Sequence, residues 1–130
     1  MLLDKYKIAE NKNIKMNVDI LTSLKELGER SYVISRMLGI LIDNAIEEAE
    51  KCEEKIIKLS FIREDRNNRA VISIQNTYLN KQVDVEKIFD KGESGKENHS
   101  GIGLWEVRNY IKKSKNLDLF TSKTDKFFKQ

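Results

Sequence analysis

Two polar residues stand on the apolar face that a helix from Ser31 to Lys51 would have at about 100° per residue. Asn44 falls at the edge of this face, and Glu48 lies one turn further along it. Burying an amide or a carboxylate without partners is costly, so these side chains either fringe the core and reach water or belong to a site. An amide oxygen can bind a hard cation such as Mg²⁺ without adding charge beside a phosphate. The apolar face consists of Ile34, Met37, Leu38, Leu41, Ala45 and Ala49.

A second chemical signal is the run from Ser100 to Leu104, which reads Ser-Gly-Ile-Gly-Leu and leads into an amphipathic helix. Glycines before a helix let the backbone approach an anion, and the free N–H groups of the first turn can hold phosphate. No Gly-Lys-Ser/Thr follows, which excludes a Walker A loop, and no strand directly precedes the run, which excludes a Rossmann fingerprint.

A third signal is Asn76, which shares one face of a predicted strand with Ile72 and Ile74. This position puts an amide at the edge of the core, where a purine could be recognised. The polar segment from 78 to 100 follows, with Lys91 and Lys96 in it. A loop of this length in a compact domain is typical of a functional lid.

These residues need a scaffold of alternating helices and strands. The pattern predicts a helix ending at 5–13, a strand at 14–20, the helix at 31–51, strands at 55–63 and 70–77, and a helix at 102–114. Asn67-Asn68 is expected to form the hairpin turn, and one helical turn is expected at 85–89. A strand at 117–122 and a last strand beginning at Phe127-Phe128 complete the prediction.

Composition limits the class of protein. The chain has 130 residues, with 39% hydrophobic and 35% charged residues and a net charge of +3. The interspersed charges argue against dedicated nucleic-acid binding, and Cys52 alone excludes an intramolecular disulfide framework. One Cys and one His cannot form a zinc cluster. With no membrane-spanning stretch and no signal peptide, the sequence predicts a single soluble domain of the cytosol.

The order of these motifs resembles the Bergerat-fold ATPases of the gyrase B, heat-shock 90, histidine kinase and MutL types. Leu38–Ala49 is similar to the N-box of sensor histidine kinases, Ile88–Gly92 to the F-box of the lid, and Gly101–Leu104 to the last glycine box. From Lys5 to Phe128 the chain most resembles the catalytic domain of peptide-pheromone receptors of Gram-positive bacteria, the accessory-gene-regulator and competence types. The resemblance implies an α+β two-layer sandwich, in which a mixed sheet packs against helices on one face and an ATP lid follows.

The resemblance also implies roles for single residues. Asn44 would be the Mg²⁺ ligand, Asn76 would face adenine, and Gly101 and Gly103 would shape the phosphate end. The residues expected to bind ATP are Asn44, Glu48, Asn76, Lys91, Lys96, Ser100, Gly101, Ile102, Gly103 and Leu104.

The chain departs from the family pattern at three places. Asn76-Thr77-Tyr78 replaces the adenine-binding Asp-x-Gly-x-Gly, as is typical of the pheromone-receptor branch, so the charge-assisted hydrogen bond to adenine is lost. Glu47 stands where many histidine kinases carry Lys, which leaves Lys91 and Lys96 either to meet the phosphate charge or to be solvated lid residues. Ile40 replaces the general-base Glu of the hydrolytic members and of the anti-sigma-factor kinases.

The phospho-accepting histidine is expected outside this chain, because the only histidine, His99, lies in the lid. No catalytic residue is therefore assigned here. The chain is expected to be the ATP-binding domain, residues 1–130, from the cytoplasmic end of a longer membrane receptor, with its last strand cut short. It would be monomeric alone and part of a homodimeric receptor, with a histidine-bearing dimerisation domain, a response regulator and a peptide pheromone as partners. Two alternatives remain open, a stand-alone anti-sigma-factor serine kinase, against which Ile40 argues, and a degenerate Bergerat domain that acts only as an interaction module.

Overall fold

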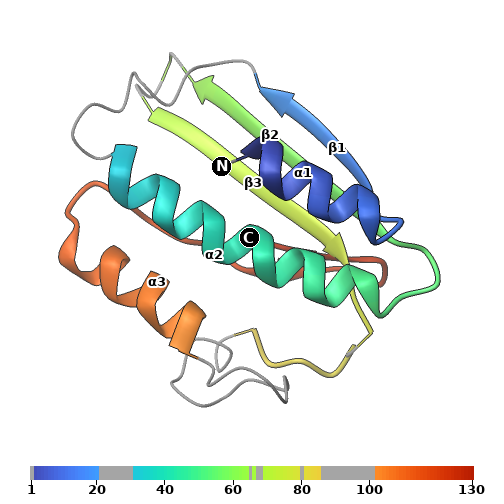
Figure 1. Cartoon of the computed structure of the whole chain (residues 1–130). Coiled ribbons are helices and arrows are strands. Elements are labelled where there is room, and N and C mark those ends of the chain that lie inside the picture. The colour runs from blue at the N-terminus through green and yellow to red at the C-terminus, as the bar shows by residue number, and fades with distance from the viewer. Residues whose placement is uncertain (1, 21–30, 65, 67–68, 80, 86–101) are drawn as a thin grey trace.

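The fold is an α+β sandwich of two layers, with the helices on one face of a five-stranded sheet (Figure 1). The computed structural model describes residues 2–20, 31–64, 66, 69–79, 81–85 and 102–130. Its elements are α1 (Leu2–Asn11), β1 (Lys15–Ile20), α2 (Ser31–Glu50), β2 (Ile56–Glu64), β3 (Arg69–Thr77), α3 (Ile102–Lys113), β4 (Ser122–Lys123) and β5 (Phe127–Lys129). Within these residues, no helix has both the length and the apolar character needed to cross a bilayer.

The sheet is mixed, with strand order β1-β2-β3-β5-β4. β1 runs parallel to β2, and the other neighbouring pairs are antiparallel. The longest ladder joins β2 to β3, from Ile57 opposite Asn76 to Glu64 opposite Arg69. β5 pairs with β3 only near the end of β3, where Asn76 lies opposite Phe128. The predicted fold class is therefore confirmed.

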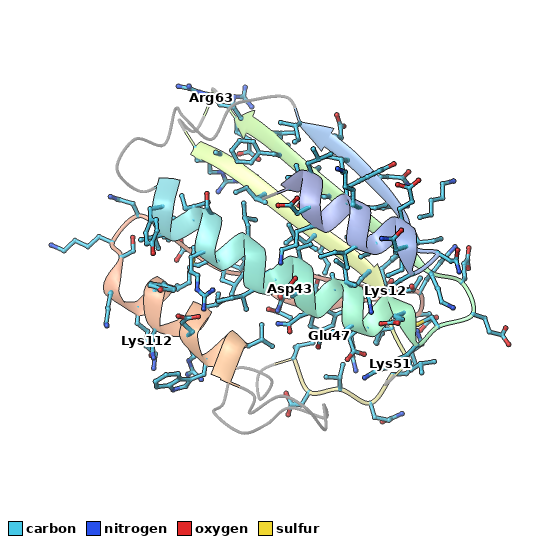
Figure 2. The ribbon with its side chains drawn as sticks, in the orientation of Figure 1. Lys12, Asp43, Glu47, Lys51, Arg63 and Lys112 are labelled. Carbon is cyan, nitrogen blue, oxygen red and sulfur yellow. The ribbon has the colours of Figure 1, made fainter. Side chains whose placement is uncertain are left out.

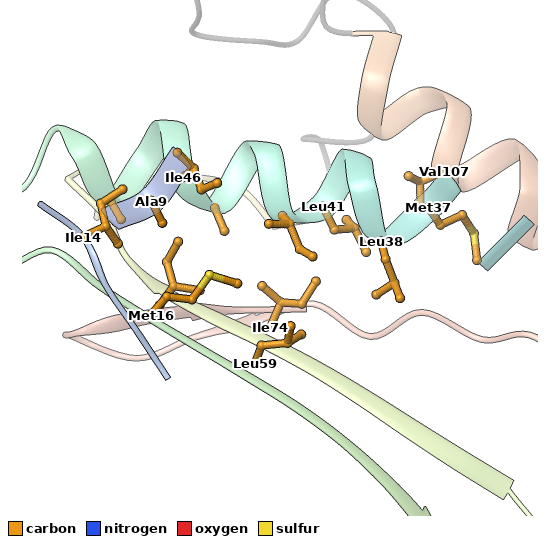
Figure 3. Close-up of a cluster of buried hydrophobic side chains, with 14 of the residues drawn as sticks. Ala9, Ile14, Met16, Met37, Leu38, Leu41, Ile46, Leu59, Ile74 and Val107 are labelled. Carbon is orange, nitrogen blue, oxygen red and sulfur yellow. The ribbon is translucent and has the colours of Figure 1, made fainter. Parts of the chain in front are cut away.

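The core lies between α2 and the inner face of the sheet (Figure 3). All six apolar residues predicted for the inner face of α2 are buried, and Ile42 and Ile46 add to them. They meet Leu59 of β2 and Ile74 of β3, which point to the same face of the sheet. Along each strand, the side chains on this face recur with a period of two. A helical period of 3.6 on one layer and a strand period of two on the other thus build one contiguous core.

The chain reverses between α1 and β1 at Asn13, which has a φ of 60°. Asparagine tolerates this left-handed conformation better than most residues do. The Ile14 amide donates to the Ala9 carbonyl at 2.9 Å, which closes the turn and starts β1 beneath the end of α1.

Three details differ from the sequence prediction or lie beyond its test. The strand expected at 117–122 is shortened to β4, because residues 117–121 have no ladder partner in the described structure. The expected burial of one face of β1 is confirmed only at the start of the strand, because Val18 is 37% exposed and Ile20 is 49% exposed. β1 is an edge strand of the sheet. The Asn67-Asn68 turn and residues 86–89 of the expected helical turn lie outside the described residues.

Candidate functional site

Asn44 lies on α2 at the edge of the buried face, as the helical projection predicts, and is half-buried. Its neighbour Asp43 points outward and forms an ion pair with Lys5 of α1 at 2.6 Å. One more pair joins Lys12, in the turn that follows α1 (Figure 2), to Glu50 at the end of α2, at 2.9 Å. The outward face of α2 is therefore fastened to α1, while the face that carries Asn44 remains directed toward the rest of the fold.

The start of α3 packs closely against the turn of α2 that precedes Asn44. Gly103, the second residue of α3, is so near that a Cβ placed on it would lie 3.2 Å from Cγ2 of Ile40. Ile40 and Asn44 are four residues apart and share one helical face. The two motifs that the sequence singled out independently, on α2 and at the start of α3, are thus brought together, and a side chain larger than that of glycine at position 103 would crowd Ile40.

Side chains further along α3 hold this arrangement. Leu104 packs against the core, and Val107 is almost fully buried. On the solvent side, Glu106 accepts a hydrogen bond from Arg36 of α2 at 3.1 Å and one from the Tyr110 hydroxyl at 3.4 Å. The hydrogen bond and charge of Glu106 raise the pKa of Arg36 above its ordinary value. α3 is therefore fixed to α2 by apolar packing inside and by a charged pair outside.

Asn76 is only 4% exposed and lies where β3 approaches the end of α2. Its Nδ2 donates to the Thr77 carbonyl at 2.9 Å, so the donor end of the amide is used and the Oδ1 end is the acceptor. Thr77 in turn accepts a hydrogen bond on Oγ1 from the Ile56 amide at 3.2 Å. The predicted position of Asn76 at the edge of the core is confirmed, and these bonds fix its orientation.

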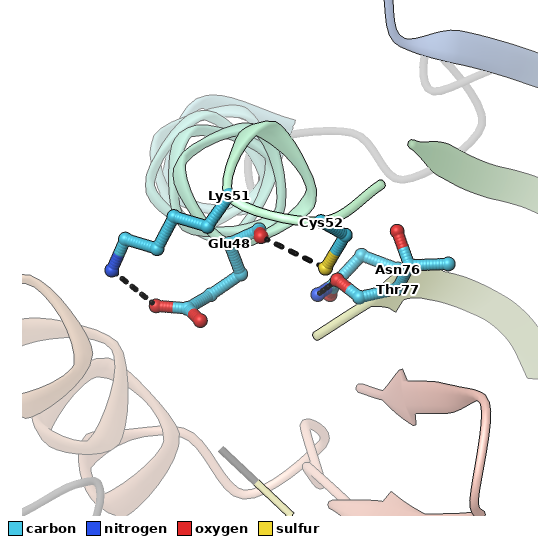
Figure 4. A network of polar contacts seen from close by, with 5 residues as sticks. All are labelled: Glu48, Lys51, Cys52, Asn76 and Thr77. Carbon is cyan, nitrogen blue, oxygen red and sulfur yellow. Dashed lines mark hydrogen bonds and ion pairs between the residues drawn. The ribbon is translucent and has the colours of Figure 1, made fainter. Parts of the chain in front are cut away.

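Glu48 is half-buried on the side of α2 that is turned toward the end of β3 (Figure 4). Its carboxylate forms an ion pair with Lys51 at 3.4 Å, and its carbonyl accepts a weak hydrogen bond from the Cys52 thiol at 3.5 Å. Glu47, which stands in place of the usual lysine, is half-buried too, and its Oε2 atom is shielded from solvent. A direct role for Glu48 in ATP binding stays a prediction.

Sequence reasoning missed the residues that fasten the chain beyond Asn76. The Tyr78 hydroxyl donates to the Thr124 carbonyl at 2.5 Å, and Lys123 donates to the carbonyls of Lys81 and Val83 at 2.9 and 3.0 Å. Lys81 also lies 3.7 Å from the centre of the Tyr78 ring. The partners are about 40 residues apart in sequence, so no local signal could have found them. They hold the first residues after β3 against the β4–β5 hairpin.

Part of the predicted site falls outside the described residues, namely Lys91, Lys96, Ser100 and Gly101, together with the F-box and His99. Ile102 begins α3, but its side chain is not described. Among the described residues, no group of three or more His, Cys, Asp or Glu side chains could hold a metal. A lone amide oxygen, Asn44, fits Mg²⁺ that is shared with phosphate oxygens, because Mg²⁺ is usually held by few protein ligands together with substrate phosphates.

The fold and the paired motifs define a class of protein, and comparison with known proteins identifies it. The model of the GHKL domain family matches residues 31–130, and the chain belongs to this family. The structure is similar to the catalytic domain of the histidine kinase ThkA, with a TM-score of 0.74 and 21% identity, covering 98% of this chain and 82% of that one. That likeness shows the fold.

A sequence relative narrows the class further. The chain is 29% identical over 116 residues to the sensor protein CitS of Bacillus subtilis (strain 168), which covers 86% of this chain. The chain spans 21% of the length of CitS. The two relatives are thus a sensor protein and a histidine kinase, and the chain itself is a GHKL domain.

Proposed function

We propose that this chain binds Mg-ATP and donates the γ-phosphoryl group to a histidine on a separate dimerisation domain of a two-component signalling kinase. The observation that carries the proposal is the close approach of Gly103 to Ile40, which sets the start of α3 beside the turn that carries Asn44. A helix start offers free N–H groups and the positive end of a helix dipole to phosphate. An amide placed next to it can bind the cation that accompanies the phosphates.

Each described residue then has a defined task. Asn44 would bind Mg²⁺, which neutralises the charge of the phosphates when it is bound. The backbone at Gly103 would face the phosphates from the start of α3. Asn76 would accept a hydrogen bond from the adenine amino group on Oδ1, since its Nδ2 already donates to the Thr77 carbonyl. This bond is between neutral groups, so we expect modest affinity for ATP.

The nature of the acceptor follows from Ile40. Its side chain packs against Gly103, so position 40 offers no carboxylate that could deprotonate water or a serine hydroxyl, and Asp43 in the same turn points outward to Lys5. A neutral imidazole carries a free lone pair near pH 7 and needs no base to attack phosphorus. A histidine acceptor therefore suits the site better than a serine does, and a response regulator would take the phosphoryl group next.

For the whole protein, we infer a receptor of the peptide-pheromone type that acts in quorum sensing. Asn76-Thr77-Tyr78, in place of an acidic adenine motif, supports this branch of the family. The domain would be the cytoplasmic part of a membrane-anchored receptor, monomeric alone and dimeric within the receptor.

Calorimetric titration with ATP, with and without Mg²⁺, tests the nucleotide site. Asn44→Ala should reduce the Mg²⁺-dependent part of ATP affinity by at least about tenfold, which corresponds to about 1.4 kcal/mol. Asn17→Ala is the matched control, since it removes the same amide from an exposed position on β1. Unchanged Mg²⁺-dependent affinity in Asn44→Ala would refute the assignment, and absence of ATP binding by the unaltered chain would favour the interaction-module alternative.

The transfer step needs a separate assay with radiolabelled ATP. The isolated chain should not label itself, whereas a dimerisation segment that carries the acceptor histidine should become labelled when it is added. Label on the chain alone that disappears in His99→Ala would overturn the assignment of the acceptor to another domain.

A further inference from the structure

β1 is an edge strand, and the side of it that faces away from β2 has no partner among the described residues. On the side of β2, the Lys15 amide donates to the Lys55 carbonyl at 2.8 Å, so the backbone groups of Lys15 point toward β2. Backbone groups alternate sides along a strand, so the N–H and C=O groups of Met16, Val18 and Ile20 point the other way. β1 therefore offers open backbone groups to a further strand.

The exposed polar side chains of β1 are a cation, an amide and an anion at equal spacing. Lys15, Asn17 and Asp19 are exposed on one face of the sheet. This face is turned away from the helices, because Met16 points into the core. In the described part of the chain, neither Lys15 nor Asp19 forms an ion pair. Charges on an edge strand usually keep other strands away. Here the two signs are opposite, so the pattern becomes complementary to itself when the strand is reversed about Asn17.

Apolar side chains are exposed at the same edge, on the face of the sheet that carries the helices. Val18 and Ile20 of β1 are exposed there, and Leu3 and Tyr6 of α1 are exposed as well. α1 contacts both β1 and α2 and lies on the β1 side of α2 (Figure 1). Lys5 of α1 forms its ion pair with α2, and Leu3 stands about 200° around the helix from Lys5, so Leu3 points away from α2. A second molecule at this edge would therefore cover apolar surface.

We propose that β1 pairs with β1 of a second copy of this chain, antiparallel and about a two-fold axis at Asn17, so that the two sheets become one. Lys15 of each copy then lies opposite Asp19 of the other, which forms two ion pairs on the face away from the helices. Met16 of each copy exchanges backbone hydrogen bonds with Val18 of the other, as their open N–H and C=O groups allow. Asn17 meets Asn17 at the axis, in a pair without backbone bonds, where opposite Cα atoms are about 4.5 Å apart.

The charges select this register over its neighbours. Shifting the axis to Val18 would place Asp19 opposite Asn17 and would separate both ion pairs. A parallel pair in register would place Lys15 beside Lys15 and Asp19 beside Asp19, and like charges opposite each other are destabilising. The antiparallel register about Asn17 therefore suits the backbone groups and the charges together.

The contact is small, and each exposed ion pair contributes little free energy. We expect the isolated chain to be monomeric at micromolar concentration and to pair at about millimolar concentration, which is the effective concentration of two domains that are tethered in one dimer. The inference takes its biological setting from the receptor dimer proposed above. Its test uses the isolated chain without nucleotide, so failure of this pairing is distinguishable from failure of the nucleotide site.

Cysteine cross-linking tests the register. At about 1 mM chain in a glutathione redox buffer, Asn17→Cys should form a disulfide-linked dimer at least about tenfold faster than Lys15→Cys or Asp19→Cys does. Only position 17 meets its own counterpart, whereas positions 15 and 19 lie about 13 Å from theirs. An equimolar mixture of Lys15→Cys and Asp19→Cys should nevertheless form the mixed dimer. Every variant keeps the buried Cys52, so the unaltered chain gives the background rate.

Charge reversal tests the attraction without a cross-link. Lys15→Glu places a second carboxylate opposite Asp19, and it should weaken self-association in sedimentation equilibrium by about fivefold or more at low salt. Adding Asp19→Lys to this variant restores opposite charges and should recover the association. Circular dichroism shows that each chain is folded. Equal cross-linking at positions 15, 17 and 19, or a double variant that associates as weakly as the single one, would overturn the proposal. A dimer in which Asn17→Cys cross-links no faster than the unaltered chain would also overturn it.

Discussion

Around Ile40 and Asn44, α2 and α3 pack closely, and a Cβ on Gly103 would lie 3.2 Å from Cγ2 of Ile40, a tight contact. Around Ile34 and Leu38, one to two turns earlier, the same helix borders a cavity of about 560 Å³. The closely packed region carries the residue assigned to the cation, whereas the residues that α2 contributes to the cavity, Ile34, Met37, Leu38 and Leu41, are all apolar. The difference indicates that close packing is concentrated where a ligand must be positioned.

The largest effect is expected when one core residue near each region is replaced by alanine. Ile46→Ala should lower the free energy of unfolding by about 3–4 kcal/mol, because Ile46 is buried in the core and does not border the cavity. Leu38→Ala should cost only about 2 kcal/mol, because Leu38 already borders the cavity and loses fewer contacts. Urea unfolding followed by circular dichroism measures both, with equal m values as the control for two-state behaviour. A cost for Leu38→Ala that equals or exceeds that of Ile46→Ala would contradict the contrast in packing.

A second comparison uses the two glycines of these helices. Gly103→Leu should destabilise the fold by about 1–3 kcal/mol and abolish ATP binding, because the added side chain separates α3 from Ile40. Gly39 has open space where a Cβ would stand, so Gly39→Ala should instead stabilise the fold by about 0.5–1 kcal/mol and leave ATP binding unchanged. Chemical unfolding and calorimetry give both readouts. The idea that α3 must approach α2 closely fails if Gly103→Leu binds ATP normally.

The smallest effect concerns Tyr78, which fastens the chain beyond Asn76. Tyr78→Phe should cost about 0.5–1.5 kcal/mol near neutral pH, because it removes the hydrogen bond to the Thr124 carbonyl. Burial, with a contribution from the charge of Asp125, raises the pKa of Tyr78 above its ordinary value of 10.0. The folded state therefore favours the protonated phenol, and this contribution is present below that ordinary value and is lost as pH rises through the folded pKa.

The unaltered chain should accordingly lose more stability than Tyr78→Phe does when the pH is raised into this range. Urea unfolding of both chains at about pH 7 and at about pH 11 measures the difference. A gap between the two chains that is the same at both pH values would show that Tyr78 does not titrate with folding.

The sequence predicted the parts of the fold whose signal is local. The apolar face of α2 and the alternation of Ile72, Ile74 and Asn76 along β3 follow from helical and strand periods, and both are confirmed. The strand expected from Leu117 was wrong in length because a strand requires a partner, and alternation alone cannot supply one.

The sequence singled out candidate site residues but not how they are arranged. Asn44 and Gly103 stood out by type and spacing, yet the contact between their two helices brings Gly103 to Ile40 across more than 60 positions of sequence. Lys123 donates hydrogen bonds to the backbone carbonyls of Lys81 and Val83. A surface lysine and two backbone carbonyls carry no sequence pattern that could predict these bonds.

The parallel pairing of β1 with β2 has a consequence for how the protein folds. Parallel neighbours require a crossover connection, and here that connection is α2, the helix that carries Asn44. Such pairing joins segments far apart along the chain. The entropy of closing the loop between them is lost before the new contacts form, so the pairing is slow. Competence to bind nucleotide should therefore arise with the non-local steps of folding, after the local β2–β3 hairpin has formed.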